Sequence, residues 1–198
     1  MKKGTLLMGM GILSSCLLMG CKSGSTNLDA KNLENMTLSV NKAGNIQMGM
    51  VESFDKSYYD ETELKNYLEE VITEYNKTAG KNAVKMSSFF VENKRASAVF
   101  VYDQMKNYKE LNETKGEYLS LEEAKSILPD ILKTPKGEEK TVDEILAETD
   151  SKKYKVLFIE EEYDVIVDGK VKYYSNGECL NEESVHTPAA DTSVIIFK

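Results

Sequence analysis

The side chains best suited to chemistry in this sequence are four carboxylates close together in the chain. They are Glu160, Glu161, Glu162 and Asp164. Crowded carboxylates can raise one another's pKa, and a pair of them can carry general acid–base catalysis, as in glycoside hydrolysis. Adjacent residues of a strand point to opposite faces, however, so a charged hairpin end is the simpler interpretation of this stretch.

The chain has one histidine, His186, in a polar stretch over residues 181–191 that we expect to be a loop. A histidine can activate a nucleophile, but a lone one in a polar loop is usually solvated. One histidine cannot build a histidine-based zinc or iron site, and no Ca²⁺-loop, phosphate-loop or dinucleotide-binding glycine pattern is present. We therefore predict no catalytic residue, no metal and no cofactor.

Cysteine usage restricts the chemistry further. The three cysteines are Cys16, Cys21 and Cys179. Cys179 has neither a histidine nor another cysteine near it in the sequence. We expect it to be a small, partly buried hydrophobic side chain and not a nucleophile.

The first 20 residues have the composition of a secretory signal. Lys2 and Lys3 precede an apolar run over residues 5–18, and Gly20 is the small residue before a cut. The run is too short to cross a hydrocarbon core of about 30 Å comfortably, which favours a signal over a membrane span. Its end, Leu18-Met19-Gly20-Cys21, resembles the lipobox of bacterial lipoprotein signals, Leu-x-Gly/Ala/Ser-Cys.

This resemblance implies that Cys21 carries a diacylglyceryl group, that the chain is cut before it, and that the protein is anchored on the extracytoplasmic side of the membrane. Two acyl chains anchor stably where one is marginal. Met19 departs from the usual pattern, and Leu13-Ser14-Ser15-Cys16 fits it better by letter. A cut before Cys16 would leave apolar residues at the mature start, so we prefer Cys21. The alternative is an ordinary cleaved signal without lipid.

The charge balance excludes some partners. The chain has 25 basic and 33 acidic side chains, and loss of Lys2 and Lys3 with residues 1–20 moves its net charge from −8 to −10. An acidic chain repels phosphate backbones, so we expect no nucleic-acid partner. The expected partners are membrane lipid, through acylated Cys21, and a protein, peptide or cell-wall component.

The rest of the chain divides into two parts. Residues 21–35 are predicted to be the lipidated cysteine and a flexible tether, because they are rich in Ser, Gly, Asn, Asp and Lys without an apolar period. Residues 36–198 are predicted to be a single globular domain. One amphipathic helix stands out over residues 61–77, with Asp60 as its N-cap and Leu68 and Val71 on its apolar face. Tyr58 and Tyr59 precede it, either as one packed and one exposed ring or as an aromatic ligand platform.

Alternating apolar residues predict three hairpins and two further strands. The hairpins lie over residues 37–54, 84–102 and 163–174, and the last has Asp168-Gly169-Lys170 at its turn, a strong hairpin signal. The further strands lie over residues 154–159 and 193–197. Short helices are expected over residues 103–111, 121–128 and 142–147, the last two capped by the pairs Ser120–Glu123 and Thr141–Glu144.

These elements predict an α+β fold, a mostly antiparallel sheet built from hairpins, with one main amphipathic helix packed on a face and several short helices. The segments FDKSYYD at residues 54–60, 102–112 and VDGKVKYYS at residues 167–175 are similar to a group of uncharacterised lipoproteins from anaerobic Gram-positive bacteria. The similarity spans most of residues 36–175. It implies a lipid-anchored extracytoplasmic protein and assigns no activity.

The sequence thus favours a membrane-anchored extracytoplasmic lipoprotein that acts as a non-enzymatic binding or interaction module. One alternative is a small cell-envelope hydrolase that uses carboxylates near residues 160–164. Another is a solute-binding accessory of a transporter, although the chain is short for the two lobes that such receptors usually have.

Overall fold

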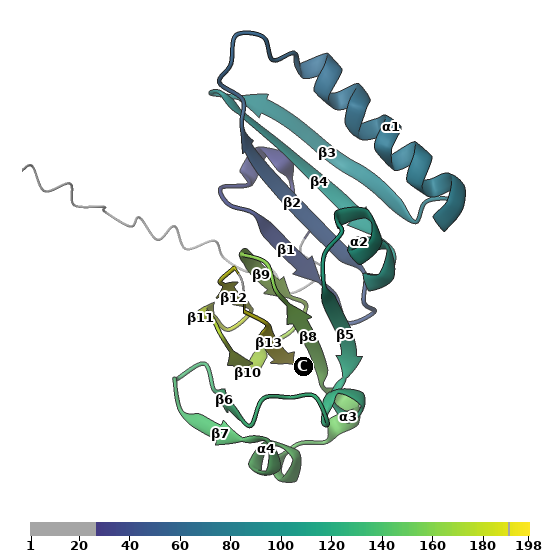
Figure 1. The fold of residues 1–198 in the computed structure, drawn as a ribbon. Coiled ribbons are helices and arrows are strands. Elements are labelled where there is room, and N and C mark those ends of the chain that lie inside the picture. The colour runs from purple at the N-terminus through teal and green to yellow at the C-terminus, as the bar shows by residue number, and fades with distance from the viewer. Residues whose placement is uncertain (1–26, 190) are drawn as a thin grey trace, which may run out of the picture.

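Two β-sheets form the framework of the protein in the computed structural model, which describes residues 27–189 and 191–198 (Figure 1). Cys21 and the signal sequence lie outside the described residues. The strands of the first sheet are β1 (Thr37–Val40), β2 (Ile46–Ser53), β3 (Val84–Glu92), β4 (Arg95–Tyr102), β9 (Tyr163–Val167), β11 (Glu178–Asn181) and β12 (Ser184–Thr187). Their order is β11-β12-β9-β1-β2-β4-β3, and β1 and β9 are parallel.

The second sheet has six strands in the order β5-β8-β13-β10-β6-β7. These are β5 (Gly116–Ser120), β6 (Ile131–Lys133), β7 (Glu139–Thr141), β8 (Lys155–Ile159), β10 (Val171–Ser175) and β13 (Ser193–Phe197). The helices are α1 (Glu61–Ala79), α2 (Met105–Asn112), α3 (Leu121–Ala124) and α4 (Val142–Glu148), and 3₁₀ turns lie at Ala30–Asn32 and Ser151–Lys153. The protein is therefore α+β, as the sequence predicts, but with two sheets where one was expected.

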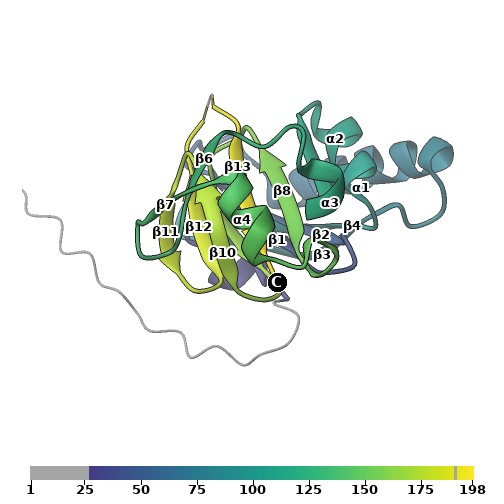
Figure 2. The ribbon, with the colours of Figure 1, turned by 90° about the horizontal axis from the view of Figure 1, so that it is seen from below.

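The apolar side chains define the layers of the fold. The main core lies between the sheets, where Leu38 and Val165 of the seven-stranded sheet and Leu157 and Phe197 of the six-stranded sheet are fully buried. A second core lies on the other face of the six-stranded sheet, under α3 and α4. It contains Leu121, Leu132, Ile145, Val156 and Ile196. Figure 2 shows α4 lying over this sheet. Both faces of β8 and β13 are therefore buried, which explains their continuous apolar runs.

Local signals in the sequence fix several elements. The hairpins over residues 37–54 and 84–102 are confirmed, and Asn93 and Lys94 form the second turn with positive φ values of 54° and 61°. Both predicted capping boxes are present: Ser120 pairs with Glu123 before α3, and Thr141 with Glu144 before α4. The first of these helices, expected to reach residue 128, ends after Ala124.

The main helix α1 begins where expected. The N–H of Glu63 donates to the Asp60 side chain at 2.9 Å, and Gly80 ends the helix. Figure 1 shows α1 running alongside β3 at the edge of the sheet. Only Ile72 of α1 is buried, whereas Leu68 and Val71, which we expected to be buried, are partly exposed. The helix covers an edge of the core and does not lie across its centre.

The hairpin expected over residues 163–174 is wrong. β9 and β10 belong to different sheets, and Asp168-Gly169-Lys170 carries the chain from one to the other. Lys170 exchanges backbone hydrogen bonds of 2.9 and 3.0 Å with Lys198. Gly169 has a φ of 139°, and a Cβ there would collide with the Lys198 carbonyl oxygen. The glycine is thus required by a close approach to a distant part of the chain and not by a two-residue turn.

The polar loop expected over residues 181–191 is also wrong in part. Residues 178–187 form the antiparallel pair β11–β12, and β12 pairs with β9. Only Val185 supplies a large apolar side chain in β12, because the other face of this strand is turned away from the core. A short strand with one polar face resembles a loop in composition, which explains the error.

The flexible tether expected over residues 21–35 differs from the structure at its end. Residues 28–35 lie on the outer face of the seven-stranded sheet, and we call them the strap. They include the 3₁₀ turn Ala30–Asn32, capped by Asp29. Ala30 is fully buried and Leu33 is 5% exposed against Val99 of β4. Ala30 and Leu33 are the only buried apolar side chains of the strap, and two residues are too few to reveal a period in a segment whose composition is that of a linker.

Candidate functional site

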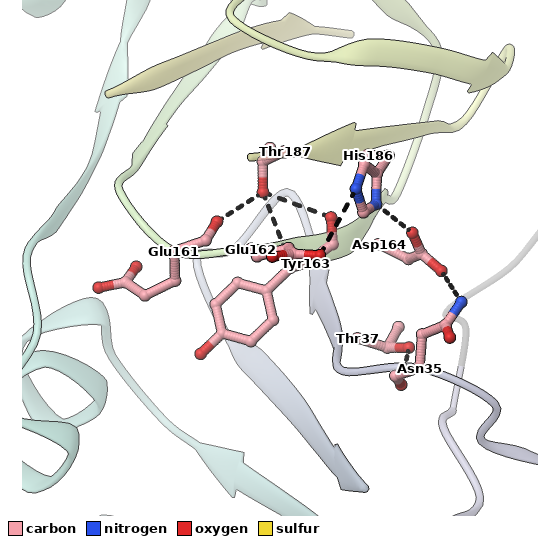
Figure 3. Close-up of polar contacts among 8 residues, drawn as sticks. All are labelled: Asn35, Thr37, Glu161, Glu162, Tyr163, Asp164, His186 and Thr187. Atoms are coloured by element: carbon pink, nitrogen blue, oxygen red, sulfur yellow. Dashed lines mark hydrogen bonds and ion pairs between the residues drawn. The ribbon is translucent and has the colours of Figure 1, made fainter. Parts of the chain in front are cut away.

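The candidate site lies on the outer face of the seven-stranded sheet, where β9 and β12 are neighbours (Figure 3). The antiparallel register places Asp164 directly opposite His186. Glu162 lies in the connection immediately before β9, and its carboxylate reaches the same side, where its Oε1 is 4.0 Å from Nε2 of His186. Sheet pairing thus gathers three polar side chains from two segments more than 20 residues apart in sequence.

Asp164 fixes the orientation of the imidazole. Its Oδ1 lies 2.8 Å from Nδ1 of His186, and its Oδ2 accepts a 2.8 Å hydrogen bond from Nδ2 of Asn35. A carboxylate can only accept hydrogen bonds, so Nδ1 is the donor in the first contact. In the neutral ring, Nε2 then carries the lone pair. Asp164 therefore holds both the histidine and the end of the strap.

The second ring nitrogen faces another carboxylate. Nε2 of His186 lies 4.0 Å from Oε1 of Glu162, beyond hydrogen-bond distance. The Glu162 side chain is 66% exposed and that of Asp164 is 24% exposed. The Glu162 carboxylate is therefore largely solvated, whereas that of Asp164 is mostly shielded from solvent. When the imidazole is neutral, Nε2 and the Glu162 carboxylate are two hydrogen-bond acceptors, and the 4.0 Å between them leaves room for a donor atom of a ligand.

These groups line an open groove of about 430 Å³. Its lining comprises Glu34, Asn35, Met36, Val51, Glu162, Tyr163, Asp164 and His186. Three of these side chains are carboxylates, so the groove is acidic around a single imidazole. The strap supplies one wall of the groove through Glu34 and Asn35.

A hydrogen-bond network behind the groove holds the two strands in place. The Thr187 hydroxyl accepts from the N–H of Tyr163 at 3.1 Å and donates to the carbonyl of Glu161 at 2.7 Å. The Tyr163 hydroxyl is buried in the core, where it accepts a 3.2 Å hydrogen bond from Tyr108. In Figure 3 the ring of Tyr163 points away from the imidazole. These contacts preorganise the backbone that carries Asp164 and His186.

The other carboxylates of the sequence cluster do not join the site. Glu160 forms an ion pair with Lys115 at 3.1 Å and accepts from Thr192 at 3.1 Å. Glu161 turns inward, and burial raises the pKa of its carboxyl above the usual value. Among the described residues, none forms a hydrogen bond with its buried Oε2. Glu160, Glu161 and Glu162 lie in the connection between β8 and β9, which belong to different sheets, so the stretch is not the hairpin end that we expected. Glu160 and Glu161 do not line the groove, so no four-carboxylate centre forms.

Nucleophilic chemistry has little support in this groove. None of its lining residues, all within the described part of the chain, is a serine, threonine or cysteine. Cys179 lies on β11 and packs partly against the main core, and burial raises the pKa of its thiol. This agrees with the prediction of a partly buried hydrophobic side chain. Residues 27–189 and 191–198 contain no cluster of three or more ligating side chains suited to a metal ion.

The pairing of His186 with Asp164 was missed by sequence reasoning. Both residues were considered, but His186 was placed in a loop. Serine, valine, histidine and threonine at residues 184–187 alternate in the manner of a strand with one polar face, and this weak signal is the one that could have brought them together.

The tyrosine pair before α1 also differs from expectation. Tyr58 is 76% exposed and Tyr59 is 42% exposed, so neither is buried as a staple on the helix. The ring of Tyr59 lies 5.0 Å from those of both Phe54 and Tyr58. The three rings form an aromatic cluster at the loop between β2 and α1, in which Tyr58 and Tyr59 are exposed and Phe54 is half-buried.

Comparison with known proteins identifies no family for this chain. No protein-family model matches the chain, and neither the curated proteins nor the solved structures give a significant match. Among the helices of the described residues, none combines the length and apolar character needed to cross a membrane.

Proposed function

We propose that the protein is a membrane-anchored extracytoplasmic lipoprotein that acts as a binding module, with the groove around Asp164 and His186 as its ligand site. The observation that carries this proposal is a preorganised, open acidic groove whose lining has no side-chain hydroxyl or thiol beyond that of core-facing Tyr163. Such a groove favours recognition over covalent chemistry. The anchor is Cys21, proposed from the lipobox-like end of the signal.

The gap between Nε2 of His186 and Oε1 of Glu162 suggests the ligand group. Two acceptors 4.0 Å apart can both receive hydrogen bonds of about 2.8 Å from one ammonium or guanidinium nitrogen. The same gap is too wide for two ligands of one tetrahedral metal ion at about 2.0–2.1 Å from each, which would lie closer together. We therefore propose a peptide or protein segment with a lysine or arginine side chain as the ligand.

Site-specific photocrosslinking on intact cells tests the groove. A photoreactive residue replaces Glu34, which lines the groove, or Glu70, an exposed residue of α1 used as the matched control. The groove position should capture a discrete partner, and the added substitution Glu162→Gln should reduce its yield. The same products from both positions, or none from the groove position, would contradict the proposal.

The anchor is tested separately. Cys21→Ala should abolish incorporation of a fatty-acid analogue and release the protein from the membrane, whereas Cys16→Ala should leave both unchanged. Loss of label in Cys16→Ala with equal labelling of Cys21→Ala would move the acylation site to Cys16. If neither the wild type nor the variants incorporate the analogue, the anchor proposal is wrong and the protein is secreted without lipid.

A second candidate function rests on the 2.8 Å contact between Asp164 and His186. An imidazole oriented by a carboxylate can act as a general base toward water, which would make the protein a small cell-envelope hydrolase. Purified protein would then turn over peptidoglycan fragments or peptides, and His186→Gln would abolish turnover while the circular dichroism spectrum is retained. Absence of turnover by the wild type favours the binding function.

A further inference from the structure

The strap, which lies within the expected tether, is part of the folded domain. Its polar backbone groups are matched by side chains of the sheet: the N–H of Leu28 donates to Gln47 Oε1 at 2.9 Å, and the N–H of Ala30 donates to Ser88 Oγ at 2.9 Å. The buried hydroxyl of Ser97 donates to the Ala30 carbonyl at 2.7 Å. Three different strands, β2, β3 and β4, thus bind the segment.

Apolar packing adds to these hydrogen bonds. Ala30, Leu33 and Val99 form a small buried cluster of their own, and Leu28, Val51 and Phe90 pack against it. At the far end of the strap, Asn35 bonds to Asp164. Contacts therefore extend along the whole segment from Leu28 to Asn35, and releasing it would expose an apolar surface of the sheet.

The bound strap limits the distance between the domain and its proposed anchor. Seven Cα–Cα steps separate Cys21 from Leu28, and a fully extended chain covers at most about 3.6 Å in each step. Leu28 therefore lies within about 25 Å of Cys21, whatever path residues 22–27 take. A free tether ending at residue 35 would have allowed about twice this reach.

This distance is too short for the chain to pass around the domain. The layers from the strap to α4 are the seven-stranded sheet, the six-stranded sheet and then the helices, each about 10 Å from the next. We propose that the outer face of the seven-stranded sheet, which carries the strap, faces the lipid surface, and that α4 points away from it. The inference rests on the proposed acylation of Cys21.

The orientation also locates the ligand. The groove around Asp164 and His186 lies on the same face as the strap, so it opens toward the space next to the membrane. Its partner would then be a basic segment held at the membrane surface, for example close to a membrane span of another protein, and not one that approaches from the medium.

Energy transfer from single positions to lipid-borne acceptors tests the orientation. The full-length protein is inserted into vesicles of neutral phosphatidylcholine that contain a dye-labelled lipid. A donor fluorophore is placed by noncanonical amino-acid substitution at Asn32 of the strap or at Asp143 of α4, both exposed. Transfer from Asn32 should exceed transfer from Asp143 by at least about twofold, because the layers between them separate the two positions along the membrane normal.

A matched insertion gives the control. Twenty Gly/Ser residues inserted after Lys22 should reduce the difference between the two positions, because the longer chain permits other orientations. Equal transfer from Asn32 and Asp143 in the uninserted protein would overturn the orientation. Failure of the wild type to carry lipid or to bind vesicles would instead contradict the anchor, so the two proposals fail by different observations.

Discussion

Leu33 of the strap lies directly on Gly49 of β2: a Cβ added at Gly49 would be 2.7 Å from Cδ2 of Leu33. Glycine inside a strand weakens the strand unless another group must approach its backbone closely. The strap is that group, since Leu33 fills the position that a side chain at residue 49 would occupy. The sheet and the strap are therefore matched in shape at one site.

The first prediction concerns this contact. Gly49→Ala should destabilise the protein by about 1–3 kcal/mol, because the added methyl group overpacks Leu33. Leu33→Ala should cost about 2–5 kcal/mol through loss of a buried side chain. In the double variant the shorter side chain at residue 33 leaves room for the new methyl group. The loss of unfolding free energy in the double variant, measured by urea unfolding, should therefore be well below the sum of the two single losses. Strict additivity of the two changes would show that the residues do not touch.

The second prediction concerns α1. Ile72→Ala should cost more than Leu68→Ala, because Ile72 is 8% exposed and Leu68 is only partly buried. The cost at Ile72 should be about 2–4 kcal/mol, and that of Glu70→Ala, on the exposed face, below about 0.5 kcal/mol. Urea midpoints at equal m-values provide the measurement. A larger loss of stability for Leu68→Ala than for Ile72→Ala would mean that α1 packs on the sheet through a different set of side chains.

The third prediction is a pH effect at Glu161. Its folded-state pKa is raised by burial above the ordinary value of 4.5, so ionising it in the native protein is unfavourable. Glu161→Gln should therefore stabilise the protein at about pH 7, and the gain should disappear below about pH 4.5, where the wild-type carboxyl is protonated in both states. Glu162→Gln, at an exposed position, serves as the control. A destabilised Glu161→Gln variant at neutral pH would refute the assignment.

The fourth prediction tests a capping box. Thr141 accepts a hydrogen bond from the N–H of Glu144 and closes the first turn of α4. Thr141→Ala should cost about 1 kcal/mol. Hydrogen exchange should speed up in α4 more than in α1, whose own cap is Asp60. Uniform acceleration in both helices would indicate a global effect and not the loss of a cap.

The sequence was informative where a few neighbouring residues decide the structure. The helix caps at Asp60, Ser120 and Thr141 depend on side chains within three or four positions, and all three are found. The burial of α1 was overestimated, because amphipathic spacing shows which stripe packs but not how deeply.

Long-range pairing explains the remaining differences. The Asp168-Gly169 signal is local, yet Lys170 pairs with the last residue of the chain and β10 with β13, so the expected hairpin does not form. The candidate site depends on the same kind of contact. Asp164 meets His186 only because β12 pairs with β9, and no local pattern specifies that register.

The central claim is that a cationic ligand group binds between His186 and Glu162. Since His186 is the only histidine in the sequence, selective ¹⁵N-histidine labelling places a single reporter in the groove. Addition of trilysine should shift the Nε2 resonance of His186 saturably in the wild type and much less in Glu162→Gln, while triglutamate should leave it unchanged. No shift with trilysine, or equal shifts in the wild type and Glu162→Gln, would contradict the claim.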